Sequence, residues 1–141
     1  MKCFDKDYSK IYDFLYTNKD YTKETNLIKK ILKKYLPNSK SLLDLGCGTG
    51  LYSNLMTKFN FNVVGVDRSS NMLNIAKHKY KKNKKLSFIK SSIENIRLNK
   101  KFDIISALFH ILSYHTTERE IDKFFSKSHM LLNKNGILIF D

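Results

Sequence analysis

The sequence predicts an α/β fold built on a doubly wound, mostly parallel β-sheet. Short apolar runs typical of strands alternate along the chain with segments whose apolar residues repeat at helical spacing. Strands that alternate with helices need crossover connections, which place neighbouring strands parallel. The length of 141 residues suits one hydrophobic core. We therefore expect residues 1–141 to form a single domain, with an amino-terminal lid and helix at 1–40 and a core at 41–141.

The strands are predicted from runs of apolar residues. In chain order they lie at residues 41–45, 62–66, 86–89, 102–108 and 137–140. The last run is apolar at every position, which is typical of a strand buried on both faces. Asn135 and Gly136 precede it and predict a turn.

The helices are predicted from apolar residues spaced three and four apart. Their segments are 22–35, 51–59, 70–80 and 118–132. Pro37 follows the first helix and marks its end. Ser69 or Ser70 can cap the third helix, and Thr117 with Glu120 forms a capping box for the fourth.

The end of the first predicted strand carries Asp44, followed by glycine at every second position of residues 46–50. Glycine there allows a tight turn and the close approach of a ligand. Position 51 is Leu, so the Gly-x-Gly-x-x-Gly dinucleotide fingerprint is not met, and Asp44 suits a cationic amino group better than a pyrophosphate. Asp67, which ends the second strand, can accept hydrogen bonds from ribose hydroxyls. Together these residues favour a nucleoside that carries an amino acid, and S-adenosylmethionine is such a molecule.

At these residues the sequence resembles the class I S-adenosylmethionine-dependent methyltransferases. The family motif, acidic-x-Gly-x-Gly-x-Gly, is matched by Asp44, Gly46, Gly48 and Gly50. The resemblance runs over nearly the whole chain. It implies a Rossmann-like methyltransferase fold, S-adenosylmethionine as cofactor and S-adenosylhomocysteine as product.

The resemblance also implies roles for individual residues. Asp67 would hold the ribose, Met72 would pack on the adenine, and Ser92 stands where many members carry an acid near the adenine amino group. Residues 108–110 are similar to the segment that lines the transferred methyl group. The cofactor contacts implied in the core are Asp44, Gly46, Cys47, Gly48, Gly50, Asp67, Arg68, Met72, Ser92, Ile93, Leu108 and Phe109.

The amino-terminal segment is rich in tyrosine and resembles the opening of methyltransferases that act on amino sugars and other small metabolites. In that group an aromatic lid covers the methionine end of the cofactor. This implies cofactor contacts from Tyr16 and Tyr21 and an acceptor contact from Tyr12. The alternative is an amphipathic helix in which Tyr8, Tyr12 and Tyr16, spaced four apart, are core residues.

Methyl transfer is an in-line displacement, so the main task of such a protein is to align donor and acceptor. A neutral amine can attack unaided, whereas a hydroxyl acceptor needs a base. His110 is the first candidate for that base, although a structural role stays open, and Tyr12 and Tyr114 complete the candidate catalytic residues. We expect no bound metal, because His110 and His115 do not form a helical i,i+4 pair and have no carboxylate cluster beside them.

The charge and composition of the chain indicate which kinds of partner it is expected to bind. The net charge is +13, but the basic residues are mostly Lys spread along the chain, which favours a solvated surface over a nucleic-acid site. We expect a small-molecule acceptor methylated on N or O, such as a nucleotide-linked sugar. A nucleic-acid methyltransferase and a cofactor-binding module without turnover stay open as alternatives. No apolar run approaches the roughly 20 residues that span a bilayer, and the polar start is unlike a signal peptide, so we expect a cytoplasmic protein.

Members of the family usually continue with a helix and two more strands after the fifth strand. We therefore expect a chain truncated at this point. The fifth strand would then be an apolar sheet edge without a partner, and a homodimer through this edge is the expected way to cover it.

Overall fold

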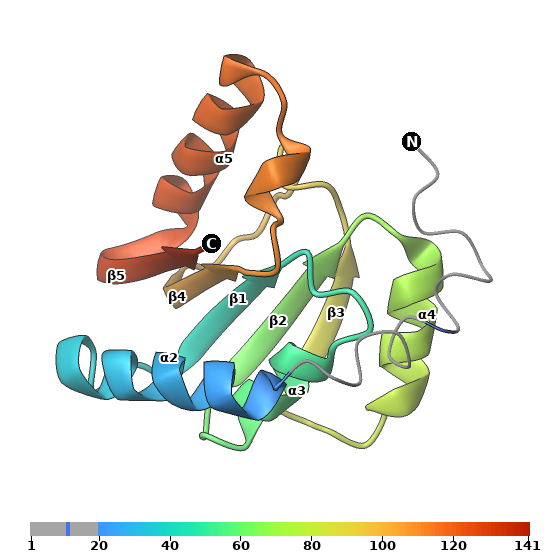
Figure 1. The fold of residues 1–141 in the computed structure, drawn as a ribbon, viewed down its shortest axis with the longest axis vertical. Helices are drawn as coiled ribbons and strands as arrows, with labels where there is room; N and C mark the ends of the chain where they lie inside the picture. The colour runs from blue at the N-terminus through green and yellow to red at the C-terminus, as the bar shows by residue number, and fades with distance from the viewer. Residues whose placement is uncertain (1–10, 12–19) are drawn as a thin grey trace.

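The computed structural model describes residue 11 and residues 20–141. Within them, five parallel strands form one sheet in the order β3-β2-β1-β4-β5 (Figure 1). The strands are β1 (Ser41–Leu45), β2 (Asn62–Asp67), β3 (Leu86–Lys90), β4 (Phe102–Ala107) and β5 (Leu132–Phe140). The helices are α2 (Tyr21–Tyr35), α3 (Leu51–Thr57), α4 (Ser70–Lys79) and α5 (Glu118–Leu131), with a 3-10 turn η1 (Leu112–Tyr114). The predicted fold class is confirmed.

The strand order reverses beside β1. The chain runs from β1 outward to β2 and β3, then returns to place β4 on the other side of β1, with β5 outside it. The loops that leave β1 and β4 therefore lead in opposite directions. In a doubly wound sheet this arrangement opens a crevice at the carboxyl ends of the strands.

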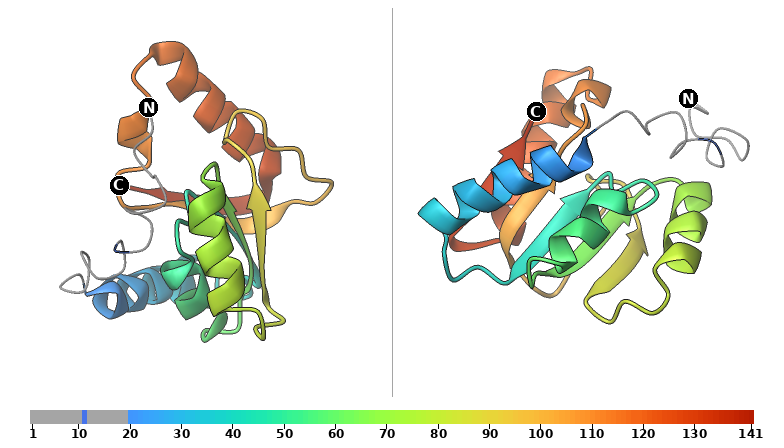
Figure 2. Two further views of the ribbon diagram at one scale, coloured as in Figure 1. Left: turned by 90° about the vertical axis from the view of Figure 1, so that its right-hand side faces the viewer. Right: turned by 60° about the horizontal axis from the view of Figure 1, so that its bottom comes forward.

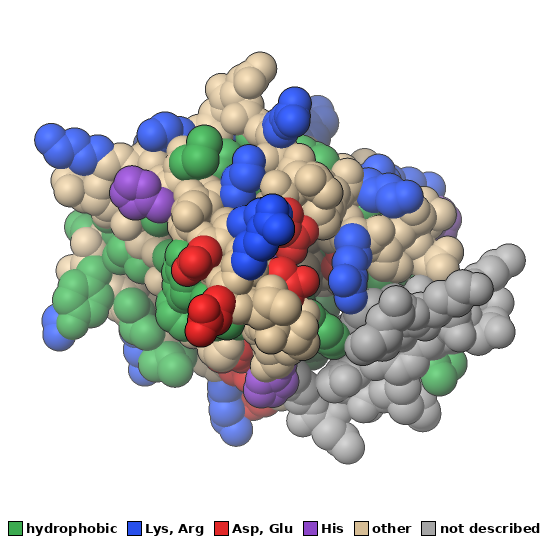
Figure 3. All heavy atoms as spheres, turned by 90° about the horizontal axis from the view of Figure 1, so that it is seen from above, with side chains coloured by type: hydrophobic (Ala, Val, Ile, Leu, Met, Phe, Trp, Pro, Cys, Tyr) green, Lys and Arg blue, Asp and Glu red, His purple; other side chains and the backbone are tan. Residues whose placement is uncertain are grey.

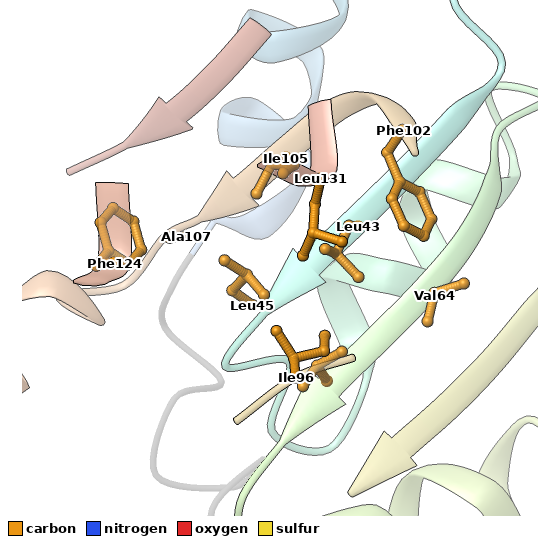
Figure 4. Packing of buried hydrophobic residues seen from close by; sticks show 10 residues of the cluster. Leu43, Leu45, Val64, Ile96, Phe102, Ile105, Ala107, Phe124 and Leu131 are labelled. Carbon is orange, nitrogen blue, oxygen red and sulfur yellow. The ribbon is translucent and has the colours of Figure 1, made fainter. Parts of the chain in front are cut away.

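Side chains alternate across the sheet, so β1, β2 and β4 supply two hydrophobic cores, with α2, α3 and α4 on one side and α5 on the other (Figure 2). The buried residues of the first core are Ile28, Leu32, Leu42, Tyr52, Met56, Phe61, Val63, Ile104 and Leu108. Those of the second are Leu43, Leu45, Val64, Val66, Ile96, Phe102, Ile105, Ala107, Phe124 and Leu131. Figure 4 shows Leu131 of α5 beside Leu43 and Ile105 in this second core.

Side-chain caps start the helices close to the predicted residues. Ser69 accepts a hydrogen bond from the first turn of α4. Thr117 and Glu120 form the capping box predicted for α5. Asp20, which the sequence analysis did not single out, caps α2 through its carboxylate. None of the described helices is both long and apolar enough to cross a membrane.

The predicted start of the last strand is wrong. β5 begins at Leu132, directly after α5, and runs through the expected turn at Asn135 and Gly136. Phe102 of β4 pairs with Leu132 of β5, and Ile104 pairs with Ile137. Five residues of advance along β5 therefore lie opposite two along β4, which is an enlarged bulge. Asn135 takes a left-handed φ of 65°, and the Asn133 amide donates to Asp103 Oδ1 of β4 at 2.8 Å. The asparagine–glycine pair therefore forms a bulge inside a paired strand.

Candidate functional site

A cavity of about 290 Å³ lies at the carboxyl ends of β1, β2 and β4, where the strand order reverses. Figure 3 views the molecule from the end towards which β1, β2 and β3 point in Figure 1, and it shows acidic side chains near the middle of this face with basic ones among and around them. Many predicted site residues line the cavity: Tyr21, Asp44, Gly46, Cys47, Gly48, Asp67, Arg68, Met72, Ser92, Ile93, Phe109, His110 and Tyr114.

Backbone hydrogen bonds hold the glycine loop against β2. The N–H groups of Gly46 and Cys47 donate to the Val66 carbonyl at 2.7 and 3.0 Å. Gly46, Gly48 and Gly50 have φ values of 72°, 54° and 79°, a region that favours glycine. Burial raises the pKa of the Cys47 thiol well above its usual value, so this side chain is an uncharged packing group.

The three glycines differ in what surrounds them. A Cβ on Gly46 would collide with the Ile111 side chain, and one on Gly50 would lie 2.6 Å from Phe88 Cζ. A Cβ on Gly48 would have no atom within 4 Å. Gly46 and Gly50 therefore allow the protein to pack against itself, whereas Gly48 leaves space open to the cavity.

Asp67 ends β2 and fastens the glycine loop to it. Its Oδ2 accepts from the Gly48 N–H at 2.9 Å, and its Oδ1 accepts from the Ser69 N–H at 2.8 Å. Burial raises the pKa of Asp67, and these two hydrogen bonds oppose that rise. A carboxylate can accept about four hydrogen bonds, so Asp67 can also accept hydrogen bonds from hydroxyl groups of a ligand in the cavity.

Asp44 forms part of the cavity wall and is 3% exposed. Ser53 of α3 and Ser106 of β4 each donate a hydroxyl hydrogen bond to a different oxygen of its carboxylate. The pKa of Asp44 is raised to about 7, mainly by burial and in small part by the nearby Asp67, while the two serine hydroxyls oppose the rise. An ionised carboxylate in such a place is stabilised by a cationic partner.

The segment after β4 has an unusual backbone. Phe109 and His110 both take left-handed φ values, 68° and 63°, which are uncommon outside glycine. Asp141, after β5, accepts hydrogen bonds from their backbone N–H groups at 3.0 and 2.8 Å. The exposed His110 lies on the cavity wall, as does Tyr114, whose ring centroid is 5.8 Å from the guanidinium of Arg68. Backbone strain of this kind is concentrated at functional sites.

The β3 side of the cavity combines apolar and polar side chains. Met72 is 2% exposed, and Ile93 lies in the segment that follows β3. The Ser92 hydroxyl is buried and has no hydrogen-bond partner in the described structure. Glu94 Oε1 and His115 Nδ1, both in the cavity wall, lie 3.6 Å apart. A polar group of a ligand can therefore bind at Ser92.

Two predicted cofactor contacts do not line the cavity. Gly50 caps α3 and faces Phe88, while Leu108 is 8% exposed and belongs to the core with α2 and α3. Leu108 follows β4 and packs in the same core as Ile104, four residues earlier, as the alternation of side chains along a strand predicts. Tyr12 and Tyr16 lie outside the described residues, so the roles assigned to them stay predictions.

Sequence reasoning missed several residues of the cavity wall: Thr49, Leu51, Tyr52, Glu94, Ile111 and His115. The sequence could have pointed to three of them by their position next to the glycines: Thr49 lies between Gly48 and Gly50, and Leu51 and Tyr52 follow Gly50. Among the described residues, no group of three His, Cys, Asp or Glu is placed to hold a metal ion.

The sheet topology, with a cavity where the strand order reverses, defines a Rossmann-like α/β domain. Residues 42–136 match the model of a methyltransferase domain family. The chain belongs to this family, which confirms the resemblance seen in the sequence.

Two relatives and one solved structure illustrate this membership. The ubiquinone biosynthesis O-methyltransferase of Pelagibacter ubique is 41% identical over 125 residues, covering 84% of this chain and 49% of that one. The dTDP-3-amino-3,4,6-trideoxy-alpha-D-glucopyranose N,N-dimethyltransferase of Streptomyces venezuelae is 26% identical over 140 residues. This match covers 98% of this chain and 58% of that one. The crystal structure of Streptomyces venezuelae DesVI superimposes with a TM-score of 0.85 at 26% identity, covering 94% and 56%. The chain thus spans about half the length of the relatives it matches.

Proposed function

We propose that this domain binds S-adenosylmethionine in the cavity and transfers its methyl group to an N or O atom of a small molecule, leaving S-adenosylhomocysteine. The observation that carries the proposal is the pair of strand-end carboxylates, Asp44 and Asp67, at the glycine loop. Asp44 suits the cationic amino group of the cofactor, and Asp67 suits its ribose hydroxyls. Membership of the methyltransferase family supports this use of the cavity.

Features of the cavity wall fit the cofactor. The open space over Gly48, which a Cβ would fill, allows a ligand to lie against the loop. Ser92 offers an unpaired hydroxyl at the place proposed for the adenine amino group, and Met72 and Ile93 offer apolar surface for the ring. Tyr21 lines the same cavity near the start of α2, where the methionine end is proposed to lie.

The cofactor supplies an activated methyl group, so the chain has to position donor and acceptor and to exclude water. We assign His110 as the base for a hydroxyl acceptor, with a ring nitrogen receiving the proton. The Asp141 carboxylate accepts a hydrogen bond from the backbone N–H of His110 and keeps this residue in place on the cavity wall. Tyr114 on the rim, and Tyr12 in the amino-terminal segment, are the proposed acceptor contacts.

The names of the relatives support a small-molecule acceptor. One is a ubiquinone biosynthesis O-methyltransferase, and another methylates the amino group of a dTDP-linked sugar. A nucleotide-linked amino sugar is therefore the acceptor to test first. We also propose that the protein acts in the cytoplasm, in keeping with its 28% of charged residues.

Calorimetric titration of the 141-residue chain tests the cofactor. We expect S-adenosylmethionine and S-adenosylhomocysteine to bind and NAD not to bind. Asp67→Asn should weaken both by about tenfold or more, because it loses a charged acceptor. Asp122→Asn, an exposed change on α5, is the matched control. A folded chain that binds neither ligand would overturn the proposed cofactor.

Transfer of a labelled methyl group tests the acceptor. We expect label to appear on a nucleotide-linked amino sugar. Label on RNA or DNA, with none on small molecules, would replace the proposal with a nucleic-acid methyltransferase. Binding of the cofactor without transfer to any acceptor would identify a binding module.

A further inference from the structure

Tyr52, the second residue of α3, carries a hydroxyl that the protein leaves without a partner. Its side chain is 3% exposed, and its Oη is buried with no hydrogen bond in the described structure. Buried hydroxyls are nearly always paired, and an unpaired one costs stability. Tyr52 also lines the cavity, so a ligand there can provide the missing partner.

Packing fixes the ring of Tyr52. It belongs to the core that includes Met56 and Phe61. The rings of Tyr52 and Phe109 pack in an edge-to-face arrangement, with the centroids 6.0 Å apart and the planes at 80°. Phe109 in turn meets Tyr21 in the same manner, with centroids 5.1 Å apart. A ring held from several sides presents its hydroxyl at one defined place.

The surroundings keep this hydroxyl a neutral donor. Burial, and next the nearby Asp44 carboxylate, raise the pKa of Tyr52 well above its ordinary value. The Ser106 hydroxyl, whose own hydrogen bond goes to Asp44, lies close enough to oppose this rise. Each oxygen of Asp44 already accepts a serine hydroxyl, from Ser53 or from Ser106. The corner of the cavity around Asp44 and Tyr52 thus combines an anionic acceptor with an uncharged donor. An α-amino acid, with its ammonium and carboxylate on one carbon, matches this pair.

We propose that Tyr52 recognises the α-carboxylate of the methionine moiety of the cofactor, while Asp44 receives its α-ammonium group. This inference rests on the proposed function and refines it. Tyr52 makes the domain selective for nucleosides that carry an intact amino acid. The hydrogen bond formed is charge-assisted, which makes it stronger than a bond between neutral groups.

Tyr52→Phe, compared with Tyr35→Phe at an exposed position on α2, tests the inference in the 141-residue chain. The ligands are S-adenosylhomocysteine, decarboxylated S-adenosylmethionine and 5′-methylthioadenosine, titrated by calorimetry. We expect Tyr52→Phe to weaken S-adenosylhomocysteine by about 10- to 100-fold. The two ligands without a carboxylate should change by less than about twofold. Tyr35→Phe should leave all three unchanged.

The melting temperature without ligand gives a second readout. Because the variant removes an unpaired buried hydroxyl and keeps the ring, we expect Tyr52→Phe to melt at the same temperature as the wild type or higher. An equal loss for all three ligands, no loss for S-adenosylhomocysteine, or a clear fall in melting temperature would overturn the role of Tyr52. A wild-type chain that binds none of the three would instead overturn the proposed function, and the inference with it.

Discussion

The carboxyl group of Asp44 couples folding to pH. Burial raises its pKa to about 7, from about 4 in an unfolded chain. Between these values the folded protein holds a proton that the unfolded chain releases. The free energy of unfolding therefore falls as pH rises from about 4 to about 7, and the full loss is present above this range. Asp67, whose pKa burial also raises, acts in the same direction.

Asp44→Asn should remove the larger part of this dependence. We expect the variant to melt at a higher temperature than the wild type at pH 8, with the difference vanishing near pH 4. It should also bind S-adenosylhomocysteine about tenfold or more weakly, because the ammonium group loses its charged partner. Thermal melts across pH and calorimetry measure the two effects, with Asp122→Asn as control. Equal melting temperatures at pH 8 would contradict this view of Asp44.

The glycine loop allows stability and binding to be separated by two matched changes. Gly48→Ala places a methyl group in open space, at a positive φ that costs about 1–2 kcal/mol. We expect a folded protein that has lost most of its affinity for S-adenosylhomocysteine. Gly50→Ala has the same backbone strain and also meets the Phe88 ring, so its loss of stability should be larger. Urea unfolding measures the stability of the two variants, and calorimetry measures their affinity. An unchanged affinity in Gly48→Ala would show that the ligand does not lie against the loop.

Single residues of the cavity were predictable where a strand-end motif or the resemblance to the family marked them. Asp44, Gly48 and Asp67 follow strands in a recognisable order, and the structure brings them together. Tyr52 is marked only by its place just after the glycines, because an aromatic residue on an amphipathic helix is otherwise indistinguishable in sequence from an ordinary core residue. Leu108 stays a predicted cofactor contact, although the structure packs it in the core with α2 and α3 instead of in the cavity wall.

At the scale of elements, the segment after β4 depends on a residue from another strand end. Asp141→Ala removes the acceptor for the Phe109 and His110 N–H groups. We expect these left-handed residues to relax, since each such conformation costs about 1–3 kcal/mol when nothing holds it. Hydrogen exchange at residues 108–115 should become faster, while exchange in β1 and β2 stays unchanged. Unaltered exchange in this segment would show that Asp141 does not hold it.

The elements were predictable to the extent that local chemistry determines them. The caps at Ser69 and at Thr117 with Glu120 depend on neighbours within one helical turn, and the structure confirms them. The start of β5 depends on a distant residue, because Asp103 of β4 binds Asn133. An asparagine–glycine pair is typical of both turns and bulges, and the sequence carries no local signal that separates the two.

At the scale of the whole molecule, β5 is an edge strand, since within the described residues it pairs with β4 alone. Phe140 and Met130 near this edge are 45% and 61% exposed. We expect the 141-residue chain to self-associate through the edge, and Phe140→Lys to weaken the association, because charge on an edge strand opposes pairing. Light scattering over a wide range of protein concentration measures both. A monomer at every concentration would contradict the proposed homodimer.

The start of β4, at the end of the sheet away from the cavity, holds neighbouring strands together. The Asp103 carboxylate accepts the backbone N–H groups of Lys40 and Ser41 at 2.9 and 3.0 Å, the Ser41 hydroxyl at 3.0 Å and the Asn133 amide at 2.8 Å. These bonds fasten β1, β4 and β5 together at the end of the sheet away from the cavity. Substitutions in the loops of the cavity therefore leave these bonds between the strands in place. Because the strand-joining bonds and the cavity loops lie at opposite ends of the sheet, the loops of such a domain can change during evolution to take new acceptors while the bonds between the strands stay the same.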